Sequence, residues 1–354
     1  MGAPRVVLSR ARKRKRAPTV ASRFLQRMAA VAGDAWRDCA ARGQAYLDFA
    51  RALDKAEAAP PIGRPAPKPP LALRPERLSV TRIETLRRDP YAIFAEYVLK
   101  LKPLDPLGAS EGAREIGNAF HKALELFVAR YPGGQLPAQA RDDLAALARA
   151  QFAAFADDAD FQAFQWPRIE KAIDFIMDFE TKRRDEIADI FVERRGSLSF
   201  PLADGALFKL TAEADRIEKR KDGRFVLIDY KTGAPPTKKV VEIGFAPQLT
   251  LEAAMAARGG FADIADGAAI AGGVYVKLMG PQGGKTTDLD FKDRSFADVA
   301  NEHFDQLVRY LSSFRDEATG YPSRPYPQYA ARYNAYDHLA RVKEWSADDG
   351  GEEA

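Results

Sequence analysis

The pattern of apolar and polar positions divides most of this chain into recognisable elements. Strand-like segments separated by Ala203-Asp204-Gly205 and Lys221-Asp222-Gly223 predict an antiparallel meander, with strands near 190–200, 207–219 and 224–231. Apolar residues three and four apart predict helices over 111–130, 138–156, 166–189, 246–257 and 295–317. An apolar run predicts one more strand over 273–278. The expected fold class is therefore α/β, with an α-β-β-β-α-β core and helical insertions.

The first 75 residues look different and predict a separate organisation. Residues 1–58 contain a strand-like run, Val6 to Ala11, and a helical pattern from Phe24 to Leu53. Prolines crowd residues 59–75, which predicts an extended, semi-rigid linker. The remainder, 76–354, is expected to form the main domain. It ends in a tail rich in proline and tyrosine, which is expected to be extended and to lie across that domain.

Charge and cysteine content restrict the setting of the protein. The formal net charge is +4, yet residues 1–27 contain no acid, and Arg12 to Arg16 is an unbroken basic run. Such a run either contacts phosphates or is simply solvated. Cys39 is the single cysteine, which excludes an internal disulfide and fits a reducing compartment. No apolar run is long enough to span a membrane, and no secretory signal is expected, so we expect a cytoplasmic location.

Candidate chemistry appears where the third meander strand ends. Asp229 and Lys231 stand two positions apart, so an extended strand points both side chains to one face. Asp215 lies on the preceding strand, and two converging carboxylates suit a hard cation such as Mg²⁺ or Mn²⁺. Lys231 is placed to orient a water and to offset developing negative charge. The alternative for an isolated Asp-x-Lys pair is a surface salt bridge.

Two predicted helices add further candidates. Gly117, His121 and Glu125 are four residues apart and form one stripe of the helix over 111–130. A glycine allows close approach, and an imidazole above it can bind a metal. For Glu125 the alternative is a helix-surface salt bridge. Gln248 lies in the first turn of a later helix, where a plain helix-terminal polar residue is nearly as good an interpretation.

These motifs, taken in order, resemble the RecB-type branch of the PD-(D/E)XK nucleases. The matching runs are Gly117-x-x-x-His121-x-x-Leu124-Glu125, Asp215-Arg216-Ile217-Glu218, Asp229-Tyr230-Lys231-Thr232-Gly233 and Gln248. The resemblance implies a restriction-endonuclease-like αβββαβ core with a mixed sheet flanked by helices. It implies Mg²⁺ or Mn²⁺ held by His121, Asp215, Asp229 and the Tyr230 carbonyl. It also implies catalytic roles for Asp215, Asp229, Lys231, Gln248 and Glu125.

More narrowly, the chain resembles the C-terminal part of the AddB family of helicase–nuclease subunits, in its alphaproteobacterial form. That implies a DNA exonuclease that processes double-strand break ends for homologous recombination. Its partners would be single-stranded DNA ends and an AddA-type ATP-dependent helicase–nuclease subunit, in a nucleoid-associated setting. Residues 1–58 would then be the remnant of a helicase-like region, and the chain would be incomplete. No Walker A loop occurs in the sequence.

Two departures from the family pattern matter. Many relatives carry four cysteines for an iron–sulfur cluster, the first in a Cys-Pro-Tyr run. Here that run is Asp89-Pro90-Tyr91, and a single cysteine cannot supply four thiolates, so no iron–sulfur cluster is expected. The family has a tyrosine four positions after the glutamine, and this chain has Glu252 at that position.

Two alternative functions stay open. One is a catalytically silent nuclease fold that serves as a DNA-binding scaffold, and the other is a stand-alone RecB-like exonuclease.

Overall fold

The computed structural model describes residues 4–15, 17–55, 62–104, 113–280, 283–330 and 334–346. The expected helix start at residue 111, the end of the basic run and the last residues of the tail lie outside them. The chain divides into two compact units, Met1–Ile62 and Gly63–Ala354. Each unit is described by itself.

The first unit is a short hairpin and two helices, and none of its described residues is buried. Strands β1 (Lys13–Arg14) and β2 (Ala17–Pro18) pair antiparallel, followed by α1 (Arg23–Ala32) and α2 (Asp34–Asp54). The run from Val6 to Ala11, expected as a strand, has no regular structure. The single helix expected from Phe24 to Leu53 is interrupted at Gly33, whose φ of +50° is a conformation that favours glycine.

The second unit has a six-stranded mixed sheet. Its strands are β3 (Arg77–Ser79), β4 (Ile187–Pro201), β5 (Leu207–Arg220), β6 (Phe225–Lys231), β7 (Ile270–Lys277) and β8 (Lys285–Asp288). The order is β3-β5-β6-β7-β8, with β4 also on β5. The β4–β5–β6 meander is antiparallel, whereas β6 and β7 are parallel. This mixed sheet confirms the predicted fold class; β3 and β8 were not anticipated.

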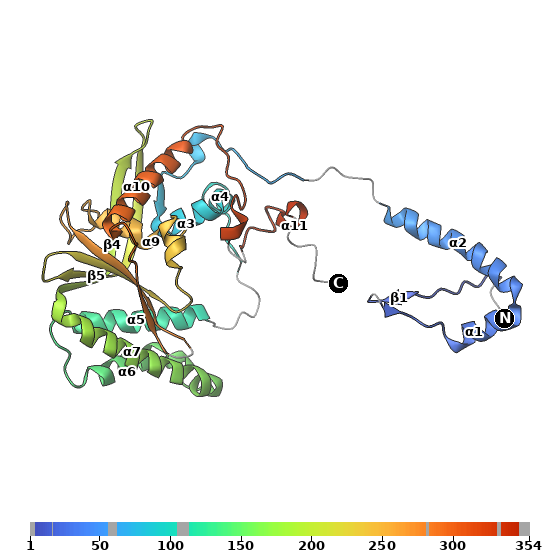
Figure 1. The fold of residues 1–354 in the computed structure, drawn as a ribbon, viewed down its shortest axis with the longest axis horizontal. Helices are drawn as coiled ribbons and strands as arrows, with labels where there is room; N and C mark the ends of the chain where they lie inside the picture. The colour runs from blue at the N-terminus through green and yellow to red at the C-terminus, as the bar shows by residue number, and fades with distance from the viewer. Residues whose placement is uncertain are drawn as a thin grey trace. The chain divides into compact units, whose positions relative to one another are not determined.

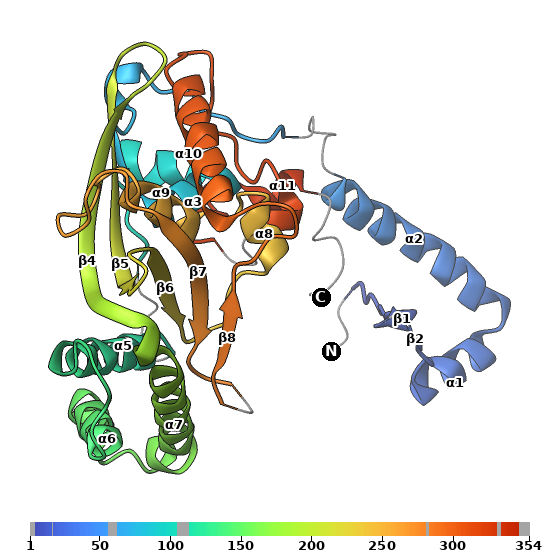
Figure 2. The ribbon, with the colours of Figure 1, turned by 60° about the vertical axis from the view of Figure 1, so that its left-hand side comes forward.

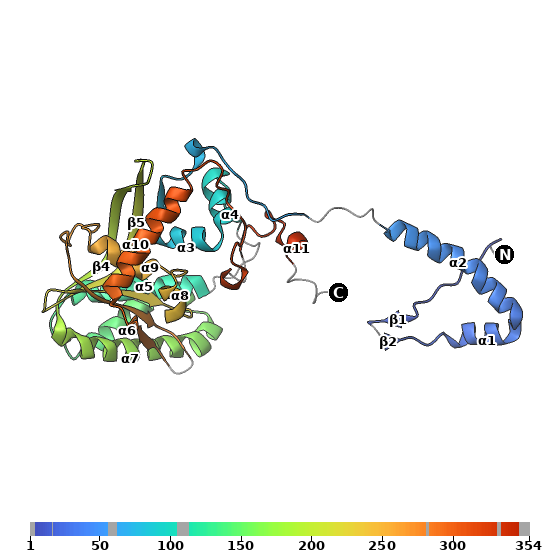
Figure 3. The same ribbon diagram turned by 45° about the horizontal axis from the view of Figure 1, so that its top comes forward.

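Helices cover both faces of the sheet (Figures 1 and 3). One face packs against α5 (Ala113–Arg130), α6 (Ala140–Gln151) and α7 (Trp166–Arg183), and the other against α3 (Val80–Arg88), α9 (Gln248–Ala256) and α10 (Phe296–Ser313). The shorter helices are α4 (Pro90–Ile93), α8 (Lys238–Glu242) and α11 (Val342–Trp345). Because both faces are covered, β6 is buried along its length up to Lys231.

The meander turns follow the glycine pattern of the sequence. Gly205 and Gly223 have φ of +81° and +83°, and each glycine amide closes a tight turn by bonding back three residues. The long helix expected over 166–189 ends earlier, because the chain passes through a 3₁₀ turn into β4. The alternation of β6 is kept, with Val226 and Ile228 facing α7 and Leu227 facing α9.

The C-terminal tail packs on the start of α4. Tyr336 and Ala340 join Tyr91 in a small apolar cluster, and the backbone amide of Arg324 donates to Oδ1 of Asp89 at 3.1 Å. The tail is less extended than expected, because it includes a 3₁₀ turn over Pro327–Tyr329 and the short helix α11. No helix in the described part of the chain has both the length and the apolar character to cross a bilayer.

Candidate active site

Asp229 and Lys231 lie at the open end of β6 and contact each other. Nζ of Lys231 is 2.9 Å from Oδ1 and 2.8 Å from Oδ2 of Asp229. Asp229 is only 2% exposed, whereas the Lys231 side chain is 31% exposed. The strand therefore places a buried carboxylate beside an ammonium that is accessible to solvent, as the spacing predicted.

Gln248 closes a small polar set with these two residues. As the first residue of α9, it donates from Nε2 to Oδ1 of Asp229 at 2.7 Å and accepts from Nζ of Lys231 at 3.2 Å. Its Nε2 also lies 3.2 Å from Oε1 of Glu252, one turn along the helix. The amide is therefore oriented by partners on both sides, and it fixes the position of Lys231.

Asp215 lies where β5 parts from β6. The β5–β6 ladder ends at the pair Arg216 and Ile228, one residue before Asp215 would oppose Asp229. Oδ2 of Asp215 accepts a hydrogen bond from the amide of Tyr230 at 2.8 Å, in place of a backbone acceptor. The predicted convergence of the two acids on adjacent strand positions is therefore present in the structure.

Burial and mutual repulsion shift the pKa values of the acids in this site upward. Burial, and then the charge of Asp215, raise the pKa of Asp229 to about 6. Burial also raises the pKa of Asp215, although its hydrogen bond to Tyr230 opposes the shift. Burial lowers the pKa of Lys231, but the charges of Asp229 and Asp215 outweigh this effect, and the net shift is upward. The ammonium is therefore kept charged by the carboxylates around it.

Helix α5 brings His121 to the same strand end. A Cβ on Gly117 would lie 3.1 Å from Oγ1 of Thr232, so the glycine permits a close approach of the helix to the residue after Lys231. His121 stands edge-on to Tyr230, with ring centroids 6.3 Å apart. Burial lowers the pKa of His121, and the nearby Asp229 opposes that shift. Its imidazole is thus favoured in the neutral form that can bind a metal.

Glu125 is engaged in an ion pair on the helix surface. Its Oε2 is 2.6 Å from Nζ of Lys122. This is the alternative interpretation of Glu125, and its catalytic role remains a prediction. The residue still contributes charge to its surroundings, because Glu125 is among the acids that raise the pKa of Glu193.

Glu193 is a site residue that the sequence did not reveal. The β4–β5 register pairs Val192 with Arg216 and Arg194 with Ala214, so Glu193 stands across from Asp215. Its φ is +48°, which is rare for a residue with a Cβ. Burial, and then the charges of Asp215 and Glu125, raise its pKa to about 7. No local pattern distinguishes this glutamate from other polar strand residues.

Glu252 is the second missed residue. It is 1% exposed and lies under Gln248, so it cannot grip DNA as a surface residue. Burial, and then the charges of Asp229 and Asp215, raise its pKa well above the usual range. The sequence showed only that this position departs from the family tyrosine, because burial of an acid on a helix depends on the packing around it.

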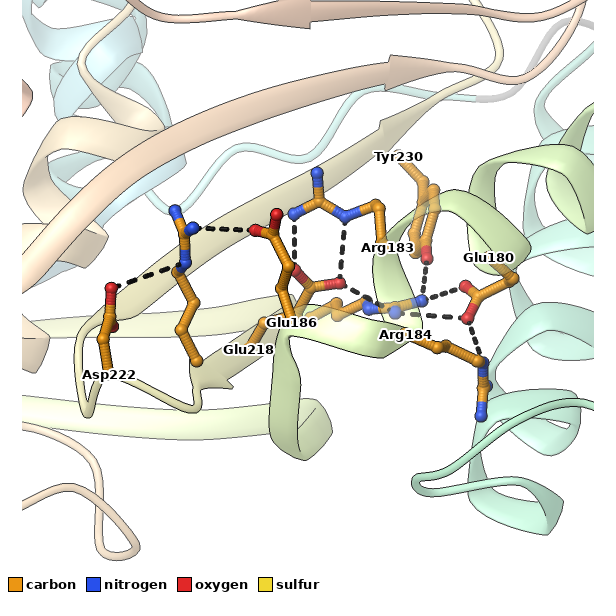
Figure 4. Close-up of polar contacts among 9 residues, drawn as sticks. Glu180, Arg183, Arg184, Glu186, Glu218, Asp222 and Tyr230 are labelled. Atoms are coloured by element: carbon orange, nitrogen blue, oxygen red, sulfur yellow. Dashed lines mark hydrogen bonds and ion pairs between the residues drawn. The ribbon is translucent and has the colours of Figure 1, made fainter.

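A buried charge network, drawn in Figure 4, lies between α7 and the sheet. This is the face to which Ile228 and Tyr230 point, opposite to that of Asp229. Arg216 has no exposed surface and forms ion pairs with Glu180 and with Glu218, whose nearest oxygen is 2.8 Å away. Nη1 of Arg216 also donates to the Tyr230 hydroxyl at 3.0 Å, and Nε of Arg184 donates to Oε2 of Glu180 at 2.8 Å. Arg216 and Tyr230, which follow Asp215 and Asp229 in the sequence, are thereby joined by a hydrogen bond.

The donor atoms of this site fit a divalent cation, but they do not form a finished cage. Nε2 of His121 and Oδ2 of Asp229 are buried and have no aligned hydrogen bond within the described residues. Together with Asp215 they offer the oxygen and nitrogen donors that Mg²⁺ or Mn²⁺ accepts. Nowhere among the described residues, however, do three His, Cys, Asp or Glu side chains already converge on one point.

The predicted ligand group of His121, Asp215 and Asp229 is therefore not preassembled. The physical reason is that Asp229 is turned to Lys231, while Asp215 is turned to the amide of Tyr230. Each carboxylate satisfies its charge or its lone pairs with a group of the protein. Their roles as ligands remain predictions.

Comparison with known proteins places the chain in a family. The family model described as the PD-(D/E)XK nuclease superfamily matches residues 77–338. An uncharacterized protein of Rickettsia bellii is 34% identical over 187 residues, which are 53% of this chain and 22% of that protein. An uncharacterized protein of Rickettsia felis is 33% identical over 191 residues, again 22% of its length.

A more distant match carries a functional name. It is an ATP-dependent helicase/deoxyribonuclease subunit of Anoxybacillus flavithermus, 28% identical over 178 residues. These are 44% of this chain and 15% of that protein, so the match spans only a small part of the relative. The family model, by contrast, spans most of the chain and contains all of the site residues described above. This chain belongs to the PD-(D/E)XK nuclease superfamily.

Proposed function

We propose that this chain is a divalent-cation-dependent deoxyribonuclease that hydrolyses phosphodiester bonds in DNA. The observation that carries the proposal is the hydrogen-bonded set of Asp229, Lys231 and Gln248 beside Asp215. Asp215, Asp229, His121 and the Tyr230 carbonyl would hold Mg²⁺ or Mn²⁺. When bound, such an ion polarises the phosphoryl oxygen and lowers the pKa of a water.

The side chains then have distinct tasks. Lys231 orients the attacking water and offsets negative charge that develops on the phosphoryl oxygens. Gln248 holds Lys231 in place and keeps it against Asp229. The exposed side of Lys231 is the side from which a phosphate approaches, because Asp229 is buried beneath it. Glu125 and Glu193 add negative charge on the α5 side.

The test is cleavage of single-stranded DNA by the purified chain with Mg²⁺. Asp229→Ala should abolish cleavage, and Lys231→Ala should lower the rate about a hundred- to a thousandfold. Lys221→Ala is the matched control, because Lys221 is an exposed lysine at the other end of β6. Circular dichroism checks that each variant is folded. Full activity in both site variants would disprove the proposal.

The biological setting is proposed from the distant relative. That relative is named as a helicase/deoxyribonuclease subunit, which supports a place for this chain in a helicase–nuclease complex. Such a complex would process double-strand break ends in the cytoplasm. An AddA-type ATP-dependent subunit would be the partner. Co-purification with such a subunit tests this proposal, and a stand-alone exonuclease would purify alone and remain active.

Two observations favour a second candidate function, a catalytically silent DNA-binding subunit. Asp229 is already neutralised by Lys231, and the described residues hold no ready three-ligand group. Calorimetric titration with Mn²⁺ separates the two functions. Heat of binding that disappears in Asp215→Asn supports the nuclease, whereas no binding in the parent chain supports the silent subunit.

A further inference from the structure

Three lysines stand in register across the end of the sheet. The β6–β7 ladder pairs Lys231 with Lys277, and the β7–β8 ladder pairs Lys277 with Lys285. Neighbouring strands lie about 4.8 Å apart, so the row spans about 10 Å from its first strand to its last. Figure 2 shows β6, β7 and β8 side by side at this end of the sheet.

The row lies on the face of the sheet that holds the candidate active site. Val276 and Leu278 of the β7 segment pack into the core under α5–α7, so Lys277 between them points to the other face. That face also holds Tyr275, which is in register with Asp229. The row therefore begins at the lysine of the proposed catalytic set and runs outward to β8.

The outer two lysines, Lys277 and Lys285, have no acidic partner among the residues that the structure describes. Lys231 is balanced by Asp229, and Lys238 on α8 forms an ion pair with Asp290. In the described part of the chain, neither Lys277 nor Lys285 has a carboxylate within ion-pair distance. Like charges placed directly opposite on neighbouring strands destabilise a sheet. The fold thus maintains a repulsive arrangement that an external anion would relieve.

The exposure of the three lysines suits a long anion that extends from the candidate active site to the edge of the sheet. Lys231 and Lys277 are half-buried, and Lys285 is exposed at the edge strand. A single small anion would be satisfied by Lys231 alone. A row that continues across two more strands fits a chain of regularly spaced negative charges.

We propose that Lys277 and Lys285 bind the sugar–phosphate backbone of the DNA strand and lead it from Lys231 to the edge of the sheet at β8. The inference rests on the proposed nuclease function, and it adds the path of the substrate. Both lysines are positioning residues, because they are placed to contact phosphates away from the reacting one.

The test is the salt dependence of binding to a fluorescein-labelled single-stranded oligonucleotide, measured by anisotropy with a metal chelator present. Each phosphate contact contributes about 0.7 to the slope of log affinity against log salt on single strands. Lys277→Ala with Lys285→Ala should therefore lower the slope by about 1.4. Lys221→Ala should leave it unchanged.

Thermal unfolding provides the second measurement. The double variant should unfold at the same or a higher temperature than the parent chain, because two opposed cations are removed. An unchanged slope in a folded double variant would overturn the proposal. So would a parent chain that binds no oligonucleotide at low salt, or a slope change seen with heparin but not with DNA.

Failure of the nuclease proposal is distinguishable from failure of this one. Binding is measured without metal, so a chain that binds DNA through the row but does not cleave it disproves only the catalytic function. In an active chain, the double variant should raise the DNA concentration needed for half-maximal cleavage. Lys231→Ala should instead lower the maximal rate.

Discussion

The amide nitrogen of Tyr230 lies 2.8 Å from Oδ2 of Asp215, so a side chain of β5 supplies the acceptor for a backbone donor of β6. The bond stands one residue past the last paired position of the two strands. It holds Asp215 beside Asp229 at the point where β5 turns away to pair with β3. The two acids are therefore placed by one side-chain-to-backbone bond as well as by the ladder.

Two substitutions of Asp215 should separate the effect of its charge from the effect of its hydrogen bond to the Tyr230 amide. Asp215→Asn keeps an oxygen acceptor for the Tyr230 amide, whereas Asp215→Ala leaves that amide without a partner. We expect both variants to lose cation binding and cleavage, and the alanine variant to be less stable than the asparagine variant by about 1–3 kcal/mol. Urea unfolding measures the difference. Equal stability of the two variants would show that the bond contributes nothing.

Gln248 should matter for activity more than for stability. Gln248→Ala removes a donor to Asp229 and an acceptor of Lys231, so Lys231 becomes free to move. We expect a loss of activity of about ten- to a hundredfold, as is typical for residues that orient a ligand or a catalytic group. Gln306→Ala, on the exposed side of α10, is the control. A Gln248 variant as active as this control would contradict the role.

The raised pKa of Asp229 predicts a pH-dependent stability in the presence of a chelator. The ordinary aspartate pKa is 3.8 and the folded value is about 6, so between these values the folded chain binds more protons than the unfolded chain. The free energy of unfolding should then fall as pH rises through this range, by about 2–3 kcal/mol at most. The loss is nearly complete about one pH unit above the folded pKa.

Asp229→Asn is the matched variant for that measurement. It lacks the titrating group, so its free energy of unfolding should decline less than that of the parent chain between pH 4 and pH 7. Urea titrations at several pH values give the difference between the two slopes. Identical slopes would show that Asp229 titrates normally in the folded chain.

The buried network on the far face predicts a large difference between two glutamates. Glu180 is fully buried between Arg216 and Arg184, whereas Glu186 pairs with Arg220 at the surface. Glu180→Ala leaves a buried guanidinium without one of its partners and should cost about 3–5 kcal/mol. Glu186→Ala should cost less than about 1 kcal/mol. Chemical unfolding of both variants tests the contrast, and similar losses would contradict it.

Much of the fold could be read from short-range patterns. The strand-like runs of β4 to β6 and the glycines of their turns are local features of the sequence, so the meander was predicted within a few residues. Strand β3 has only three residues, too few to show a period. Strand β8 is largely polar, and its place depends on the ladder with β7. These two strands depend on tertiary pairing.

In the candidate site, too, the residues fixed by local strand geometry were predicted, and those that depend on tertiary contacts were not. Asp215, Asp229 and Lys231 were predicted because strand geometry fixes which side chains share a face. Glu193 and Glu252 were missed because their importance comes from neighbours distant in sequence, which bury them and crowd them with charge. Lys231 contacts both oxygens of Asp229, and this contact leaves the cation site unassembled. It depends on the side-chain conformations of the two residues, which their spacing in the sequence does not determine.

The hairpin of β5 and β6 has a consequence for how this protein can vary. Side chains alternate along a strand, so adding one residue within the paired part of β5 or of β6 would turn one of the two acids to the far face of the sheet. Changes of length must therefore be absorbed in the turn around Asp222, or occur two residues at a time. The number of paired strand residues between each acid and the turn is thus constrained to change in steps of two.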